Sequence, residues 1–158
     1  MTTRKPDANP EGNIAQNRRA RHDYEILQSY EAGIVLTGSE IKSVREHRVQ
    51  LQGSYARLKG DEIWLQDAHI AEYANAGYMR HDPTRDRKLL LHRKEINKIS
   101  EAMGAQGLTL VPLSMYFKRG RAKVQLGLAR GRKSYDKRDV IAERDVERDM
   151  QRARRHAV

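Results

Sequence analysis

Cysteine is absent from this chain of 158 residues, so neither disulfide bonds nor thiolate chemistry contribute to its fold or function. Aromatic residues are few, with one tryptophan and one phenylalanine. No stretch approaches the roughly 20 apolar residues of a membrane-spanning helix, and the first residues lack the apolar core of a signal peptide. We therefore expect a soluble, cytoplasmic protein.

Motifs for catalysis and metal binding are also missing. The sequence contains no Walker A motif, no dinucleotide-binding glycine motif, no nucleophile elbow and no HExxH motif. None of the six histidines forms an H-x-H or H-x-x-x-H pair. Acidic residues such as Glu31, Glu40 and Glu62 lie among basic residues, where surface ion pairing explains them. We predict that the chain is not an enzyme and needs no metal ion or other cofactor.

Positive charge is what the sequence has in excess. Lysine and arginine number 31 against 21 aspartates and glutamates, which gives a net charge of +10. Charged residues make up 33% of the chain, against about 25% in an average protein. Such an excess predicts a polyanionic partner. RNA, DNA and an anionic membrane surface all remain open from composition alone.

The length suits one domain with tails at its two ends. Residues 1–17 contain two prolines and a glycine without apolar periodicity, which predicts a flexible, basic N-terminal arm. Residues 18–130 carry the regular apolar patterns of a folded domain. Residues 131–158 form a basic C-terminal tail.

Alternation of apolar and polar residues predicts about six or seven short strands within residues 18–130. The turn Lys59-Gly60-Asp61 predicts a hairpin between residues 54–58 and 62–66. Gly33 interrupts an early strand and suggests a bulge or a barrel corner, and Pro112 suggests a bulge or an edge position. Residues 124, 126 and 128 should form one apolar strand face.

Two helices are expected between these strands. Thr37 and Glu40 match a capping box that begins a short helix. Ile96, Ile99 and Met103 lie on one face of a longer helix that should end at Gly104. Short antiparallel strands with few helices favour a mainly β fold, namely a small closed antiparallel β-barrel of the oligonucleotide-binding (OB) type.

Residues 131–138, which form a basic junction, and residues 139–158, which form the rest of the tail, differ in residue pattern from the folded domain. Residues 131–138 hold five charged side chains, four of them positive, around the ring of Tyr135, a combination typical of RNA contact. A solvated linker is the alternative. Residues 139–158 lack glycine and proline, but their apolar face is too thin to hold a helix on the barrel. We predict a tail that is disordered when free and helical on a partner, or else a solubilising extension.

The chain contains, in this order, the motifs Asn17-Arg18-Arg19-Ala20-Arg21-His22-Asp23-Tyr24, Glu31-Ala32-Gly33, Gly38-Ser39-Glu40-Ile41-Lys42-Ser43-Val44-Arg45, Asp82-Pro83-Thr84-Arg85, Arg87-Lys88-Leu89-Leu90-Leu91-His92 and Gly131-Arg132-Lys133-Ser134-Tyr135-Asp136-Lys137-Arg138. These motifs resemble those of the SsrA-binding protein family, also called small protein B. The resemblance implies an OB barrel that holds the tRNA-like domain of transfer-messenger RNA (SsrA RNA) and delivers it to stalled ribosomes in trans-translation. It also implies an adaptor rather than an enzyme, with elongation factor Tu engaged indirectly through the charged RNA and no DNA or membrane partner.

Two groups of site residues follow from this resemblance. Glu31, Leu90 and His92 match RNA-gripping positions of the family, and the tail matches the segment that enters the decoding region and vacant mRNA path of the small ribosomal subunit. We predict contacts to transfer-messenger RNA at Arg19, His22, Glu31, Lys42, Arg45, Leu90 and His92. We predict ribosome contacts at Arg132, Lys133, Tyr135, Asp136, Lys137, Arg138, Arg144, Arg148, Met150 and Arg152.

Two other classes of function remain open. A general RNA chaperone would share the basic barrel but would bind single strands without preference for a folded RNA. A nuclease or RNA-modifying enzyme would need a metal site or a general base.

Overall fold

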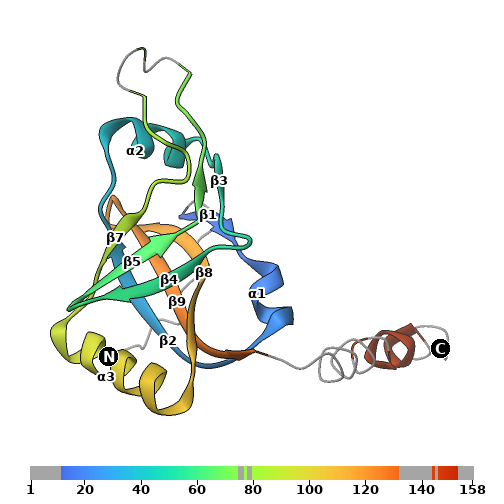
Figure 1. Cartoon of the computed structure of the whole chain (residues 1–158). Coiled ribbons are helices and arrows are strands. Elements are labelled where there is room, and N and C mark those ends of the chain that lie inside the picture. Colours follow the sequence, from blue (N-terminus) through green and yellow to red (C-terminus); the bar gives the residue numbers. More distant parts are fainter. Residues whose placement is uncertain (1–11, 75–76, 78–79, 132–143, 145, 153–158) are drawn as a thin grey trace, which may run out of the picture.

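A computed structural model describes residues 12–74, 77, 80–131, 144 and 146–152 of the chain (Figure 1). The described part is mainly β with a few helices, as predicted. The elements are, in chain order, β1 (Asn13–Gln16), α1 (Arg18–Asp23), β2 (Tyr24–Ile34), α2 (Gly38–Arg45), β3 (Val49–Gln50), β4 (Tyr55–Lys59), β5 (Glu62–Gln66), β6 (His69–Ile70), β7 (Arg87–Leu90), α3 (Arg93–Gln106), β8 (Thr109–Lys118) and β9 (Arg121–Gly131).

One antiparallel sheet of seven strands forms the body, in the order β1-β8-β4-β5-β7-β2-β9. Strand β9 pairs with β8 as well as with β2, so the pairings lead from β8 through β4, β5, β7, β2 and β9 back to β8. Strand β1 lies outside this circuit and pairs with β8. A separate pair, β3 and β6, lies near α2 in the upper part of Figure 1. Strand β8 thus pairs with β1, β4 and β9, and β9 pairs with β2 and β8.

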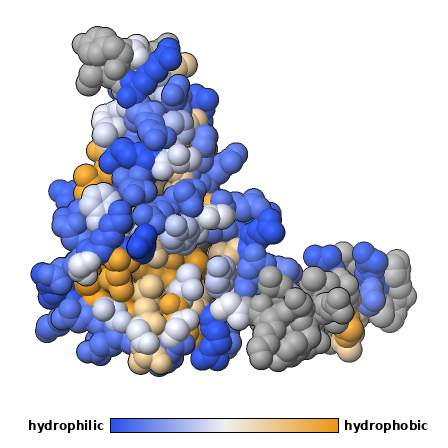
Figure 2. Space-filling model, in the orientation of Figure 1, coloured by the Kyte–Doolittle hydropathy of each residue, from blue (hydrophilic) through white to orange (hydrophobic). Residues whose placement is uncertain are grey.

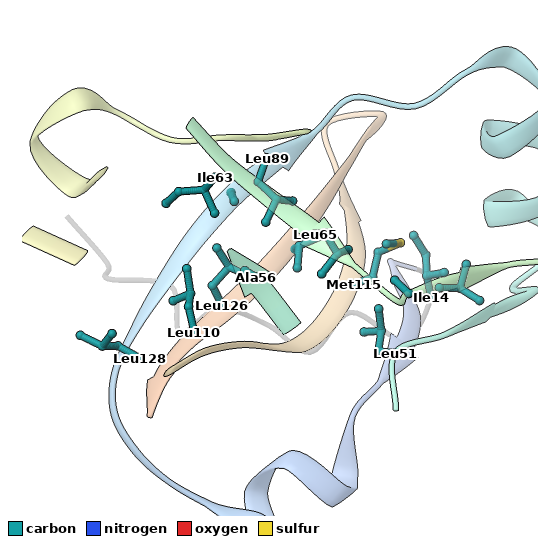
Figure 3. Packing of buried hydrophobic residues seen from close by; sticks show 14 of the residues in the cluster. Ile14, Leu51, Ala56, Ile63, Leu65, Leu89, Leu110, Met115, Leu126 and Leu128 are labelled. Atoms are coloured by element: carbon teal, nitrogen blue, oxygen red, sulfur yellow. The ribbon is translucent and has the colours of Figure 1, made fainter. Parts of the chain in front are cut away.

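The inner faces of these strands enclose one large apolar core (Figure 3). The β4–β5 hairpin has the predicted register, with Leu58 opposite Ile63. Val124, Leu126 and Leu128 of β9 all face the core, as their alternation predicts. Each fully buried aliphatic side chain contributes about 1.5–3 kcal/mol, so this face accounts for much of the stability of β9.

The helix ends follow capping chemistry. The Oγ1 atom of Thr37 accepts from the backbone of Glu40, and the Glu40 carboxylate accepts from the backbone of Thr37, which confirms the predicted capping box. The predicted end of the second helix at Gly104 is wrong, because α3 continues to Gln106. Gly107 ends α3 in the left-handed conformation with φ of 62°, whereas Gly104 inside the helix costs only about 1 kcal/mol.

The N-terminal end of the domain differs from the sequence-based expectation. Residues 13–16 of the predicted flexible arm form β1, paired with residues 114–116 of β8. The next six residues form α1, a helix that was not predicted. Asn17 explains both: its side-chain amide donates to the carbonyls of Pro112 at 2.9 Å and Leu51 at 3.3 Å, and its carbonyl oxygen accepts from the backbone of Ala20. These contacts fasten β1 and α1 to the body.

Two bulges shape the long strands. The register of β8 against β9 shifts between Pro112 and Ser114, which confirms the predicted bulge at Pro112. The bulge in β2 lies between Ile26 and Gln28, so the expectation of a bulge at Gly33 is wrong. Gly33 keeps regular pairing, and its missing side chain instead leaves room for Leu90.

A buried ion cluster joins α2 to the segment before β7. Glu40, which was expected to pair at the surface, is fully buried and accepts from Arg87 Nε and from Arg85 Nη2, the latter at 2.6 Å. Arg87 is also fully buried, and its Nη1 atom donates to the Ala68 carbonyl at 2.8 Å. A buried carboxylate needs such partners, and these partners hold the pKa of Glu40 low against the raising effect of burial.

The surface is mostly hydrophilic, with an apolar area in the lower half of the face in Figure 2, between α3 and α1. Among the described residues no helix is long and apolar enough to cross a membrane.

Residues 144 and 146–152 of the tail are helical and exposed. The prediction that the tail becomes helical only on a partner stays a prediction.

Candidate nucleic-acid interface

Glu31 lies on the outward face of β2, next to the buried Ala32. Its Oε2 atom accepts from the Tyr116 hydroxyl at 2.5 Å, and Lys118 Nζ donates to Oε1 at 3.2 Å. Tyr116 and Lys118 belong to β8, so both side chains reach across β9 to meet the carboxylate. The carboxylate is thus fixed in position by two donors from a strand that is not its direct neighbour.

This arrangement shifts the acidity of both groups. The hydrogen bond from Tyr116 is the main cause that lowers the pKa of Glu31, with Lys118 adding to the effect and burial opposing it. Burial, followed by the hydrogen bond to Glu31, raises the pKa of Tyr116. At neutral pH the pair therefore consists of an ionised carboxylate and a neutral phenol.

Leu90 lies on the same outward face, on the neighbouring strand β7. It is directly opposite Gly33 and 51% exposed, which is unusual for a leucine. A Cβ atom on Gly33 would lie only 3.3 Å from the Leu90 Cβ atom, so a larger residue at this position would require Leu90 to shift by a few tenths of an ångström. His92 follows β7 after one intervening residue, Leu91, and is the N-cap residue of α3. The structure thus places Glu31, Leu90 and His92 on two adjacent strands and the turn after them.

Arg19 and His22 lie on α1, where they share one acidic partner. Arg19 Nε is 3.4 Å from Asp23 Oδ2, and His22 Nδ1 is 3.0 Å from Asp23 Oδ1. Both contacts are local to the helix. They orient the two basic side chains on the same short element.

Lys42 and Arg45 lie on α2, at the far end of the molecule from α1 (Figure 1). The Lys42 ammonium group is 5.2 Å from the centre of the Tyr73 ring, a cation–π contact. The seven predicted RNA-contacting residues therefore do not form one compact patch. They fall into three groups, on α1, on β2 with β7, and on α2.

Four of the predicted ribosome-contacting residues lie in the described part of the tail. Arg144, Arg148 and Arg152 are exposed and four residues apart, so they share one side of the helical segment. Met150 is 58% exposed on another side. The other six, Arg132, Lys133, Tyr135, Asp136, Lys137 and Arg138, lie outside the described residues.

A groove of about 590 Å³ with a mixed polar and apolar lining lies beside Glu31 and is formed by residues of β1, α1 and β8. It could not be predicted from the sequence, because its lining residues come from β1, α1 and β8, which lie far apart in the chain. The outward position of Tyr116 could have been read from the alternation around the buried Met115. The groove is lined by Gly12, Asn13, Gln16, Asn17, Arg18, Arg21, Glu31, Leu113, Ser114, Tyr116, Phe117, Lys118, Arg119 and Gln125.

Nothing in the described part of the chain suggests a metal centre, since no three potential ligands gather there. The polar side chains around Glu31 are instead suited to hydrogen bonding and to contact with anions.

Comparison with known proteins decides the family. The family described as SmpB protein matches residues 14–156, almost the whole chain. The chain belongs to the SmpB family. The match covers both the sheet and the tail.

Individual relatives support the assignment to the SmpB family. An SsrA-binding protein of Chloroflexus aurantiacus is 60% identical over 147 residues, which cover 92% of this chain and 92% of the relative. One of Limosilactobacillus reuteri is 51% identical over 156 residues, or 99% of each chain. A chain of the solved structure "tmRNA-SmpB: a journey to the center of the bacterial ribosome" is 52% identical with a TM-score of 0.64, covering 77% of this chain and 86% of that chain.

Proposed function

We propose that this chain binds the tRNA-like domain of transfer-messenger RNA and delivers it to stalled ribosomes for trans-translation. Membership of the SmpB family, the relatives named SsrA-binding protein and the ribosome context of the similar solved structure support this role. The net charge of +10 provides the electrostatic attraction that RNA binding requires. The chain acts as a binding protein and adaptor, not as an enzyme, and works where bacterial ribosomes do, in the cytoplasm.

One observation carries the proposal for the RNA interface, namely the fixed carboxylate of Glu31 beside the exposed Leu90. A carboxylate repels phosphate. A carboxylate in a basic, RNA-binding region is therefore suited to accept hydrogen bonds from N–H or O–H groups of the RNA. An exposed leucine at 51% provides an apolar contact for a base or a ribose. His92, in the turn between this strand and α3, adds a hydrogen-bonding ring.

The predicted RNA-contacting residues on α1 and on α2 extend this interface. Arg19 on α1 and Lys42 and Arg45 on α2 provide positive charge, and His22 on α1 adds a hydrogen-bonding ring. Such flanking cations position an RNA backbone rather than read its bases. The tRNA-like domain is a folded RNA, and spaced contacts of this kind recognise shape.

The sheet suits an OB-type barrel. Its pairings return to β8, which supports closure of six strands into a barrel. OB barrels bind oligonucleotides on an outer strand face, and the outward face that carries Glu31 and Leu90 has this role in our proposal.

The tail is proposed to contact the small ribosomal subunit at its decoding region and mRNA path. The aligned guanidinium groups of Arg144, Arg148 and Arg152 suit a polyanion such as ribosomal RNA. Residues 132–138 would form the entrance to this contact, with the Tyr135 ring stacking on a base.

A competition experiment tests the RNA partner. The full-length chain is bound to labelled tRNA-like domain of transfer-messenger RNA and then competed with the same unlabelled RNA or with an unstructured RNA of equal length and charge. We expect the folded RNA to compete far better, and binding to weaken as salt rises. Equal competition by the two RNAs would instead identify a general RNA chaperone.

A further inference from the structure

The β4–β5 hairpin has an outward face that holds none of the seven predicted RNA-contacting residues. Alternate residues of both strands, Ala56, Ile63 and Leu65, are buried in the core, so the residues between them point outward. Two of the six outward side chains are aromatic, although aromatic residues make up only 6% of the chain. The six are Tyr55, Arg57 and Lys59 on β4 and Glu62, Trp64 and Gln66 on β5.

Arg57 lies between the two aromatic residues. It is directly opposite Trp64 in the hairpin, and it follows Tyr55 by two residues on the same face of β4. Tyr55 and Trp64 are therefore diagonal neighbours, a relation that aromatic side chains can span. Within the described part of the chain Arg57 forms no ion pair and no side-chain hydrogen bond, so its guanidinium group is available to bind a phosphate through parallel N–H donors.

The ring of Tyr55 is open to a ligand. Its residue is 39% exposed, and its hydroxyl forms no hydrogen bond with another described residue. Nucleobases stack on exposed aromatic rings of this kind with little preference for sequence, because every base has a flat π-face. Tyr55 with Arg57 thus combines a stacking surface and a phosphate donor on neighbouring outward positions.

Trp64 is already held in place. Its Nε1 atom donates to Glu62 Oε2 at 3.1 Å, and the Lys59 ammonium group lies 5.5 Å from the centre of the ring. Because Lys59 covers this ring, we assign the stacking to Tyr55 and give Trp64 the role of a fixed neighbour. A side chain that is ordered before binding loses little further freedom when a ligand arrives.

The charges on this face favour an anionic partner. Lys59 pairs with Asp86 at 3.3 Å, and Lys88, which is opposite Trp64 on β7, pairs with Glu62 at 3.0 Å. Both pairs are exposed, and exposed pairs of this kind are weak, so the two lysines can also contact phosphate. With Arg57 the face carries three cations against two carboxylates.

An unpaired strand fits this arrangement better than a duplex. In a duplex the faces of the bases are stacked on one another, whereas a single strand can place a base on an aromatic ring and its phosphate on a neighbouring cation. The strand order also separates this face from Glu31. Strand β4 is connected to β2 through β5 and β7 in one direction and through β8 and β9 in the other, so the two strands lie on opposite sides of the circuit.

We propose that the outer face of β4 and β5 binds a single-stranded segment of RNA outside the tRNA-like domain, with a base stacked on Tyr55 and a phosphate held by Arg57. The inference rests on the proposed function only for RNA as the partner. It adds a second RNA-binding surface, so that one copy of the chain holds a folded RNA and an unpaired strand at the same time.

The one tryptophan of the chain lies on this face and reports on it. Its fluorescence is followed while the full-length chain is titrated with short oligouridine, with an RNA duplex of the same length and with inorganic phosphate. We expect saturable quenching by oligouridine, with the duplex binding about tenfold more weakly because its bases cannot stack on Tyr55. Phosphate alone should not quench at the same concentration.

Four variants separate the contributions. Tyr55→Ala should weaken oligouridine binding about tenfold, whereas Tyr55→Phe keeps the ring and should bind normally. Arg57→Gln should weaken binding and lower the slope of log affinity against log salt by about 0.7, the loss of one phosphate contact. Lys98→Gln removes an exposed cation of α3 and should change neither quantity. Unchanged melting temperatures verify that each variant is folded.

Oligouridine is finally added to the chain already saturated with the tRNA-like domain, and we expect both RNAs to stay bound. Displacement of that domain would overturn the inference, as would equal affinity for the duplex, quenching by phosphate alone or full affinity of Tyr55→Ala. If the tRNA-like domain binds but oligouridine causes no quenching, only this second surface fails. If neither RNA binds, the proposed function fails as well.

Discussion

Arg87 and Glu40 form an ion pair in which neither side chain is exposed, although 47 residues separate them in the chain. The pair joins the capping box of α2 to β7. Through Arg87, which also donates to the carbonyls of Ala68 and Pro83, it fixes the segment between β6 and β7. The position of α2, with Lys42 and Arg45 on it, therefore depends on one buried carboxylate.

Substitution Glu40→Gln should destabilise the protein by about 3–5 kcal/mol, because it leaves the charge of Arg87 buried without a counter-ion. Urea unfolding followed by circular dichroism measures this loss. Glu46→Gln removes an exposed carboxylate 4.0 Å from Arg48 and should change stability by no more than about 0.5 kcal/mol. A similar small effect for both variants would contradict the structural role of Glu40.

Stability should fall in acid. The hydrogen bond from Arg85 and other donors hold the pKa of Glu40 below its ordinary value, so its stabilising contribution is present above the unfolded pKa of about 4.3 and is lost as pH falls through the folded pKa. The free energy of unfolding should therefore decrease from about pH 5 downward. In Glu40→Gln this decrease should be shallower, and parallel pH profiles of the two proteins would argue against the assignment.

Glu31→Lys should weaken binding to the tRNA-like domain although it raises the net charge by two. Added positive charge strengthens nonspecific binding, but the substitution removes the acceptor that Tyr116 and Lys118 hold in place. Glu101→Lys on the exposed side of α3 changes the charge equally and serves as the control in filter-binding assays. If Glu31→Lys bound as tightly as Glu101→Lys or more so, Glu31 would be an incidental surface acid.

A chain that ends after Gly131 should keep its RNA affinity. Strand β9 ends at Gly131, so this cut leaves the sheet, the groove and all seven proposed RNA-contacting residues intact. We expect less than about a tenfold loss in affinity, which corresponds to about 1.4 kcal/mol. A larger loss, with an unchanged melting temperature, would show that the tail takes part in RNA binding.

Val146→Pro should stop tagging on stalled ribosomes without affecting folding or RNA binding. Val146 is 54% exposed in the helical part of the tail, and a proline inside a helix costs about 3 kcal/mol. Val146→Ala keeps the helix and serves as the control in a reconstituted trans-translation assay. Normal tagging by the proline variant would mean that the tail works in an extended form.

Features that arise from contacts between residues close together in the chain could be predicted from the sequence, whereas features that depend on distant residues could not. The capping box at Thr37, the bulge at Pro112 and the β4–β5 hairpin arise from neighbouring residues, and all were predicted correctly. Helix α1 was missed, because six residues without apolar periodicity give no signal of their own. Asn17 stabilises it through carbonyls that lie far away in the sequence.

In the candidate site, too, contacts between residues far apart in the chain were the ones that could not be predicted. Glu31, Leu90 and His92 were predicted from the family resemblance alone, since nothing in their immediate neighbours marks them, and their contact with RNA stays a prediction. Tyr116 and Lys118 were not found, because their contact with Glu31 depends on the register of three strands. The burial of Glu40 was missed for the same reason, as its arginine partners are 45 and 47 residues away.

The pairing of β1 with β8 has a consequence for the order in which the protein folds. The contact of Asn17 with Pro112 spans 95 residues, so the first strand to leave the ribosome has no partner until nearly the whole domain has been synthesised. Contacts of such long range form slowly, because the intervening loop must close first. The groove, with one wall at the start of the chain and the other near the end of the sheet, is therefore completed late in folding.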